Sequence, residues 1–325
     1  MAKLAMVEAV TAALAYELEH DPAVVVLGED VGVNGGVFRA TNGLQQRFGK
    51  DRVLDTPLAE ALIAGMSIGM AAMGMKPVAE IQFSGFIYPT VDQMINHAGR
   101  LRTRTRGRLH VPMVLRAPSG GGIHAPEHHS ESNEALFAHM PGIRTVMPSS
   151  PSRAYGLLLA AIRDPDPVVF LEPTRLYRIN KQEVEDNGQA LPLDTCFVLR
   201  EGNDVTLVSW GAMIHETMQA AAGLADQGVD CEVIDLATIS PIDFETILES
   251  VGKTGRLVVI HEAPKNCGVG AEIAATVAEK AIYSLKAPIE RITGYDIPMP
   301  LFKLEHDYMP SVARVTAGIR KVMEA

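Results

Sequence analysis

Residues 24–32 read VVVLGEDVG, a short run of apolar, mostly β-branched residues that ends in glycine and two acidic residues. An uninterrupted apolar run of this length predicts a strand buried on both faces, as in a parallel sheet covered by helices. Similar runs predict further strands at 78–81, 113–115 and 168–171. Helical patterns surround them, at about 6–20, 58–74, 90–103 and 151–163. This alternation is typical of an α/β domain.

A second alternation of strands and helices follows a polar stretch without periodicity at about residues 180–204. Strands are expected at 205–209, 231–236, 256–261 and 289–293, and helices at 213–227, 243–251, 268–285 and from about 310. A chain of 325 residues is long enough for two domains. We therefore predict two tandem three-layer α/β domains with mainly parallel sheets, residues 1–190 and 191–325.

The composition excludes several classes of protein. Hydrophobic residues make up 47% and charged residues 21% of the chain, which argues against disorder and fibrous repeats. The net charge of −10 argues against nucleic-acid binding. The longest uncharged apolar stretch, 61–75, is shorter than the ~18–20 residues that span a bilayer. Three cysteines without short-range pairing and no apolar signal core near the start predict a cytoplasmic protein.

The residues that follow each apolar run are the first candidates for a site, because parallel α/β sheets bind ligands outside the carboxyl ends of their strands. Glu29 follows the first run between two glycines, as either a solvated loop acid or a carboxylate in a site. The segment IQFSGF, residues 81–86, places polar and aromatic groups after the second strand. Phe86 is more typical of a core residue than of a platform for a cofactor.

Glu60 lies in the segment DTPLAE, residues 55–60, and is followed by fifteen uncharged residues. Thr56 as N-cap and Pro57 at the first helical position predict a helix start. Glu60 could face water and favour the helix dipole. It is nevertheless the only charge on a helix that is apolar nearly all round, which predicts burial, and a buried carboxyl has a raised pKa unless it is paired.

The segment SGGGIHAPEHHS, residues 119–130, combines three glycines and three histidines in one loop. Glycine-rich loops with groups that titrate near neutral pH are frequent places for catalysis. A metal site is one alternative, but the spacing lacks His-Glu-x-x-His and no cysteine is near. A structural or partner-contacting loop is another. The arginines that alternate over residues 100–108 predict a solvated face or a protein interface.

Taken in order along the whole chain, these segments resemble the β subunit of the thiamine-diphosphate-dependent E1 component of 2-oxo acid dehydrogenase complexes. The motifs that carry the resemblance are LGEDVG (27–32), GGVFR (35–39), DTPLAE (55–60), EIQF (80–83), HS (129–130) and AIRD (161–164). The resemblance implies a pyrimidine-binding domain followed by a transketolase-type C-terminal domain.

The same resemblance implies roles for individual residues. Glu60 would hydrogen-bond to the aminopyrimidine ring of thiamine diphosphate and act as a proton relay that activates the cofactor. The wall around the ring would be completed by Glu29, the backbone of Leu58, Gln82 and Phe86. His129, with Phe83 and Phe86, would face the 2-oxo acid. His129 would either hydrogen-bond to the substrate carboxylate or protonate the intermediate, and both roles remain open.

The resemblance also implies two bound ions. Related chains hold a structural potassium ion with residues that match Ala161, Ile162, Asp164 and Asp166, although the last position is often Asn. The motif that binds Mg²⁺ and diphosphate begins Gly-Asp-Gly, and this triplet is absent from the sequence. We therefore expect an α subunit to supply the Mg²⁺ ligands within an α₂β₂ heterotetramer, and the single chain to bind the cofactor weakly.

The resemblance also implies docking of the E2 acyltransferase on the C-terminal domain, where an acidic chain suits a basic partner. Pyruvate is the expected substrate, from the segments VNGGVFRAT (33–41) and GIHAPE (122–127). Branched-chain 2-oxo acids and acetoin are the alternatives. A scaffold of this fold that docks E2 without chemistry is the rival from another class, and the presence of Glu29, Glu60 and His129 argues against it.

Overall fold

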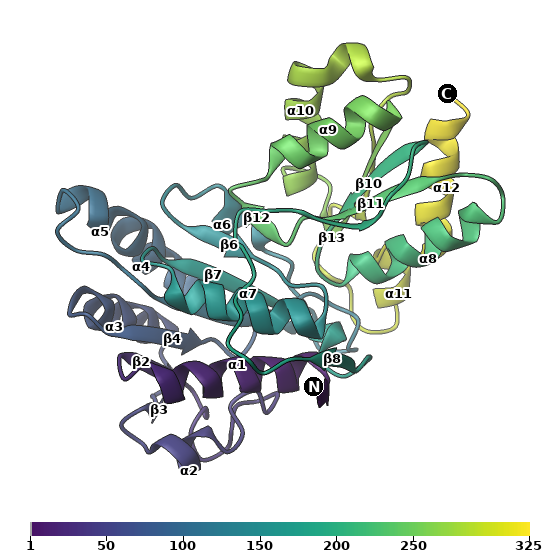
Figure 1. The fold of residues 1–325 in the computed structure, drawn as a ribbon. Helices are drawn as coiled ribbons and strands as arrows, with labels where there is room; N and C mark the ends of the chain where they lie inside the picture. The colour runs from purple at the N-terminus through teal and green to yellow at the C-terminus, as the bar shows by residue number, and fades with distance from the viewer. Residues whose placement is uncertain (1) are drawn as a thin grey trace. The chain divides into compact units, whose positions relative to one another are not determined.

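The computed structural model describes residues 2–325, which fall into two compact units (Figure 1). The first unit comprises the chain up to Ser119 together with Leu136–Leu193. The second comprises Gly120–Ala135 and Asp194–Ala325. The histidine-containing loop thus belongs to the second unit. The domain boundary between residues 190 and 191 stays a prediction.

The first unit is built on a parallel sheet whose strands lie in the order β6-β7-β5-β4-β2-β3. Four of the strands are buried along almost their whole length, as the apolar runs predict. The bounds are β2 (Val24–Gly28), β3 (Val53–Asp55), β4 (Lys76–Glu80), β5 (Val114–Ser119), β6 (Arg144–Val146) and β7 (Val168–Pro173).

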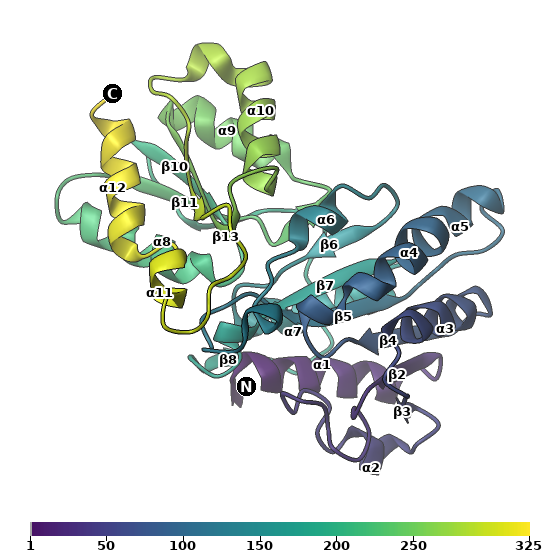
Figure 2. The same cartoon turned by 180° about the vertical axis from the view of Figure 1, so that it is seen from behind.

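Helices cover both faces of this sheet, as Figures 1 and 2 show. On one face, α1 (Met6–His20) and α7 (Pro151–Arg163) lie side by side. The other carries α3 (Glu60–Ala72) and a run made of α4 (Val91–Gln93), a π-helical turn (Met94–Ala98) and α5 (Gly99–Arg104). Right-handed crossovers explain why these helices lie on opposite faces of the sheet. The connections through α3 and α4–α5 run along the sheet in the opposite direction to the connection through α7. Further elements are β1 (Ala2–Leu4), which pairs with β8 (Gln182–Val184), α2 (Leu44–Phe48) and α6 (Glu134–Ala138), whose first two residues belong to the second unit.

The second unit has a sheet in the order β14-β13-β10-β11-β9, parallel except for the edge strand β9. Helices α8 and α12 pack together, and α9 packs on α10 (Figure 1). The chain runs from β10 to β11 on one side and later to β13 on the other, so the topological switch point lies between β10 and β13. The bounds are β9 (Phe197–Arg200), β10 (Val205–Ser209), α8 (Met213–Ala225), β11 (Cys231–Asp235), β12 (Thr238–Ser240), α9 (Phe244–Thr254), β13 (Leu257–Pro264), α10 (Val269–Ala281), β14 (Glu290–Gly294), α11 (Glu305–Tyr308) and α12 (Val312–Met323).

The predicted fold class is confirmed, since both units are α/β with mainly parallel sheets. The stretch expected to lack regular structure, 180–204, contains the short strands β8 and β9. These strands pair antiparallel with distant segments and therefore leave no long apolar run in the sequence. Among the described residues, no helix combines the length and apolar character that a membrane span requires.

Candidate functional site

Polar residues follow neighbouring strand ends in the first unit. Gly28, the last residue of β2, lies opposite Asp55 of β3 and Glu80 of β4. Glu29 comes directly after β2, residues 56–60 follow β3, and Gln82 comes soon after β4. Because carboxyl ends of parallel strands share one edge of the sheet, these segments meet at that edge.

Glu29 is a buried carboxyl group at this edge. Its Oε1 atom has no hydrogen-bond partner among the described residues. Burial raises the pKa of Glu29, and the negative charges of Glu60 and Asp30 raise it further. Glu29 and Glu60 therefore lie within electrostatic range of each other, and Glu29 favours its protonated form more than an ordinary glutamate does.

Glu60 is half-buried, so the expectation that it is buried within an apolar helix is wrong for this chain. The reason is that α3 packs against its own unit through one face only, while Leu62 and Met73 are 50% and 85% exposed. The residues that α3 buries are Ile63, Ala64, Ser67, Ile68 and Ala71.

The predicted start of this helix at Thr56 and Pro57 is also wrong. The Thr56 N–H donates to the Gly28 carbonyl at 3.0 Å, which extends the pairing of β3 with β2. The helix consequently begins only at Glu60, with Ala59 at the N-cap position and no side-chain cap. Leu58, in the segment between them, is 79% exposed. This late start places Glu60 in the first turn of α3, where its backbone N–H is not needed by the helix.

Aromatic side chains line the segment after β4. Phe83 packs edge-on against Phe38 and against Phe86, with ring centroids 5.2 and 5.9 Å apart. Phe86 ends a short 3₁₀ turn, Ser84–Phe86, and is half-buried. The Gln82 side-chain amide donates to Asp30 Oδ2 at 3.4 Å. Gln82 and Phe86 are thus fixed within the same short segment that follows the strand.

A buried ionic network, which sequence reasoning missed, joins residues of the neighbouring strands β4, β5 and β7. The fully buried Arg116 donates to both carboxylate oxygens of Glu172 at 2.7 Å and also to Glu80. The Tyr177 hydroxyl donates to Glu172 at 2.5 Å. One cation faces two carboxyl groups, and burial raises the pKa of Glu80 against the opposing effect of Arg116. The available signal was the charge inside one predicted strand, at Glu80, and directly after two others, at Arg116 and Glu172, because charged residues are paired when buried.

His129 lies in the second unit, at the end of the 3₁₀ turn Glu127–His129. It is half-buried, and its backbone N–H donates to the Pro126 carbonyl at 2.9 Å. Among the described residues, no group of three or more His, Cys, Asp or Glu side chains could hold a metal ion.

The residues expected to hold potassium surround the end of α7. Ala161 and Ile162 are buried in the last turn. Asp164 accepts from Arg144 at 3.2 Å and from the Asp166 backbone N–H at 2.8 Å, and the Asp166 side chain pairs with Arg102 at 2.6 Å. An arginine of this chain is paired with each of the two carboxylates. A bound cation is therefore not needed to neutralise their charges. The potassium site stays a prediction.

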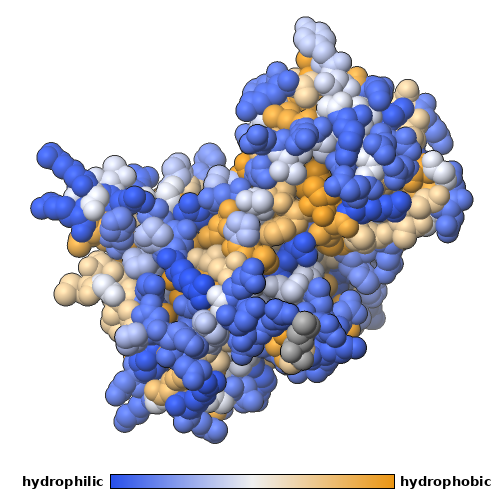
Figure 3. Space-filling model, in the orientation of Figure 1, coloured by the Kyte–Doolittle hydropathy of each residue, from blue (hydrophilic) through white to orange (hydrophobic). Residues whose placement is uncertain are grey.

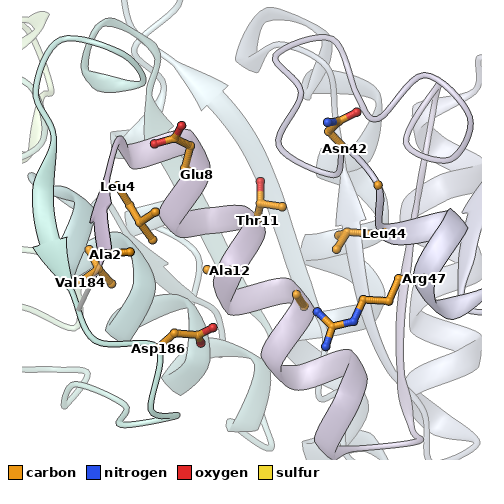
Figure 4. Close-up of a pocket in the computed structure, with 12 residues that line it drawn as sticks. Ala2, Leu4, Glu8, Thr11, Ala12, Asn42, Leu44, Arg47, Val184 and Asp186 are labelled. Atoms are coloured by element: carbon orange, nitrogen blue, oxygen red, sulfur yellow. The ribbon is translucent and has the colours of Figure 1, made fainter.

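A cavity of about 670 Å³ lies elsewhere in the first unit, between α1, the start of α2 and the β1–β8 pair (Figure 4). None of the predicted site residues lines it. Its charged side chains are engaged within the chain: Glu8 accepts from the Ala5 N–H and pairs with Lys181, Arg47 pairs with Glu19, and Asp186 accepts from a tyrosine. The cavity is therefore not the candidate site.

The alternating arginines are exposed on α5 and directly after it, and the surface in this region is strongly hydrophilic at the left of Figure 3. Arg102 pairs with Asp166, while Arg104 and Arg108 donate to backbone carbonyls of their own segment. This arrangement agrees with the expectation of a solvated face or an interface.

Known protein families match both halves of the chain. Residues 2–180 match the pyrimidine-binding domain of transketolase, and residues 194–315 match the transketolase C-terminal domain. A protein of Acholeplasma laidlawii named pyruvate dehydrogenase E1 component subunit beta is 50% identical over 325 residues, covering 100% of this chain and 99% of that protein. The chain belongs to the E1 component β-subunit family. The predicted resemblance is thereby confirmed.

Further relatives of the E1 β-subunit family agree over the whole length. The Bacillus subtilis protein of the same name is 48% identical over 324 residues, with 100% of both chains covered. Among solved structures, a split-gene transketolase described as an inactive β4 tetramer matches with a TM-score of 0.80 and covers 99% of each chain. Its sequence identity is 22%, so this likeness shows a shared fold and nothing further.

Proposed function

We propose that this chain is the β subunit of a thiamine-diphosphate-dependent E1 component. Together with an α subunit, it would oxidatively decarboxylate pyruvate and transfer the acetyl group to the lipoyl group of an E2 acyltransferase. The main observation that supports this proposal is the whole-length sequence identity of 50% and 48% to proteins named pyruvate dehydrogenase E1 component subunit beta. This naming favours pyruvate over branched-chain 2-oxo acids and acetoin.

The carboxyl edge of the first unit fits the proposed cofactor. Glu29 has a raised pKa and a buried oxygen without a hydrogen-bond partner in the part of the chain that the structure describes, and Glu60 lies within range of its charge. The charge of Glu60 favours the protonated form of Glu29, so a proton is held at this edge, as a relay to a heterocyclic ring nitrogen requires. We assign Glu60 the relay role, with Glu29, the Leu58 backbone, Gln82 and Phe86 as the binding wall. When bound, thiamine diphosphate supplies the carbon centre that stabilises a carbanion after decarboxylation.

His129 is our candidate for the group that acts on the substrate. Its ring nitrogens can hydrogen-bond to the carboxylate of a 2-oxo acid or carry a proton for transfer. Phe83 and Phe86 would provide the apolar surface beside a small acyl group.

An α subunit is the proposed partner at α3. Leu58 and Leu62 are exposed on either side of Glu60, and an exposed apolar face of this kind is typical of an interface. Burial of this face by the partner would also desolvate Glu60. The missing Gly-Asp-Gly motif supports a partner that supplies the Mg²⁺ ligands within an α₂β₂ assembly.

The remaining parts of the proposal rest mainly on family membership. We propose that E2 docks on the C-terminal domain, that residues 1–190 and 191–325 are the two domains, and that the protein acts in the cytoplasm. The net charge of −10 supports a basic docking partner.

Replacement of Glu60 by Gln tests the proposed chemistry. Glu60→Gln keeps the shape of the side chain and removes the acid, so we expect decarboxylation of pyruvate by the reconstituted α–β complex to fall ~10²-fold or more. Glu249→Gln, an exposed position on α9, is the matched control. Full activity of Glu60→Gln would favour the docking scaffold instead. A wild-type complex that decarboxylates 3-methyl-2-oxobutanoate faster than pyruvate would refute the substrate assignment.

A further inference from the structure

The loop that carries His129 is attached to the second unit on both sides of the histidine. At its base, the Gly120 N–H donates to the Glu131 carbonyl at 2.9 Å, which closes the loop on itself. The glycines of this loop bring its backbone against two carboxylates of the C-terminal part of the chain.

Glu262, on β13, joins the two arms of the loop, which are the segments before and after His129. Its Oε1 atom accepts from the Gly121 N–H at 2.5 Å and from the Ser132 hydroxyl at 3.2 Å. Gly121 precedes His129 and Ser132 follows it. One carboxylate oxygen therefore holds both arms, and hydrogen bonds to a charged acceptor are about twice as strong as neutral ones.

Glu305, the first residue of α11, holds the first arm alone. It is 1% exposed, and its two oxygens accept from the backbone N–H groups of Gly122 and His124. The His124 ring also meets His306 of the same helix, with ring nitrogens 3.2 Å apart. A buried carboxylate that accepts two backbone N–H groups fixes the direction of that backbone segment.

Glycine is required where the carboxylates approach. A Cβ on Gly120 would lie 2.8 Å from Glu262 Oε1, and the residue has φ +81°. A Cβ on Gly121 would lie 2.6 Å from the Met299 methyl carbon and 2.9 Å from Glu305 Oε1. The glycine-rich motif thus matches the positions of Glu262 and Glu305.

The far end of the loop has its own attachment. Glu134 is buried, and its Oε1 accepts from the Trp210 indole N–H at 3.2 Å. Trp210 follows β10 and stacks on His261 of β13, with ring centroids 5.1 Å apart. The loop is therefore anchored at the switch point of the second sheet, on the two strands between which its order reverses.

We propose that Glu262 and Glu305 are positioning residues that hold the loop segment 121–132 so that His129 is presented to the substrate. This inference deepens the proposed function and rests on it for the role of His129. The hydrogen-bonded clamp itself lies wholly within the second unit and does not depend on that role.

Glu305→Gln is the sharpest test, because an amide offers one acceptor oxygen where two N–H groups need one each. We expect the amides of residues 121–132 to exchange hydrogen about tenfold faster or more in the full-length chain. In the reconstituted complex we expect kcat for pyruvate to fall ~10-fold while KM changes little, since misplacement of a reacting group is costly. Glu262→Gln is the second variant, and Glu249→Gln is the control with unchanged exchange and kcat.

A double-mutant cycle separates positioning from a general structural effect. If Glu305 acts through His129, Glu305→Gln lowers kcat no further in a chain that already carries His129→Gln. Equal losses in both backgrounds, or wild-type exchange in both Glu305→Gln and Glu262→Gln, would overturn the inference. If the wild-type complex has no activity on 2-oxo acids, the proposed function fails, and exchange alone then decides whether the clamp exists.

Discussion

Two buried carboxyl groups, Glu29 in the first unit and Glu134 in the second, share a raised pKa but differ in what surrounds them. Glu29 is affected by burial and by the charges of Glu60 and Asp30, so its proton is coupled to the candidate site. Glu134 is affected mainly by burial and has an indole N–H as partner, and its pKa is raised from 4.5 to about 7. The first arrangement suits proton transfer, whereas the second suits a structural acid that is neutral at moderate pH.

Glu134 makes a specific contribution to the pH dependence of stability. Its folded pKa of about 7 exceeds the unfolded value of 4.5, so the folded state binds the proton more tightly. The stabilisation is fully present below pH 4.5 and is lost as the pH rises through 7. Glu134→Gln imitates the protonated form. We therefore expect the free energy of unfolding of the wild type, relative to Glu134→Gln, to fall by up to about 3 kcal/mol between pH 4.5 and 8.

Urea denaturation of both proteins across this pH range measures the effect, with Glu249→Gln as the control that follows the wild type. A difference between wild type and Glu134→Gln that stays constant with pH would show that Glu134 does not titrate in the folded protein as described.

At the scale of elements, amphipathic or uniformly apolar segments were predicted closely, and segments that depend on distant partners were not. Helices α1 and α7 and strand β10 have the predicted bounds, because their burial follows from local pattern. The start of α3 was wrong, because a backbone hydrogen bond to Gly28 outweighs the capping pattern of Thr56. Strands β3 and β6 were missed because each is only three residues long.

The candidate site likewise combines residues that local sequence pattern predicts with contacts that depend on distant partners. The rule for carboxyl ends of strands led to Glu29 and Gln82 from the sequence alone. It could not predict that Glu80, Arg116 and Glu172 pair with one another, since they lie on separate strands whose order the sequence does not contain. Nor could it predict that the glycine-rich loop is held by Glu262 and Glu305, which follow it by well over a hundred residues.

The exposed face of α3 yields a prediction at this scale. Leu62 is 50% exposed, so Leu62→Gln should change the free energy of unfolding of the single chain by less than about 0.5 kcal/mol. If the α subunit covers this face, the same substitution should weaken α–β assembly ~10-fold or more, because a polar side chain would be buried in an apolar contact. Sedimentation of the mixed subunits measures the assembly.

Ile282→Gln is the matched control, because Ile282 is also 50% exposed but lies in the second unit. It should leave both stability and assembly unchanged. Undiminished assembly of Leu62→Gln would place the α subunit on another surface of the chain.

At the scale of the whole molecule, the proposed functional groups are distributed over both units. Glu29 and Glu60 belong to the first and His129 to the second, whose own sheet carries the anchors of the histidine loop. The chain contains carboxyl groups and aromatic rings suited to a heterocycle but lacks the Gly-Asp-Gly motif for a metal-bound diphosphate. Under the proposed function, such a chain would provide only part of what a charged cofactor requires.

Binding of the cofactor by the separate subunits tests this division directly. Without metal ligands, the chain would leave the diphosphate charges uncompensated, and the contacts of one ring cannot offset that loss. Calorimetric titration of thiamine diphosphate with Mg²⁺ into the purified chain should therefore show no binding at micromolar concentrations, whereas the α–β complex should bind. Glu29→Gln, placed in the complex, should weaken binding, because the Glu29 side chain belongs to the proposed wall. Tight, Mg²⁺-dependent binding by the single chain would mean that this chain holds the diphosphate itself, and the assignment of the metal to a partner would then be wrong.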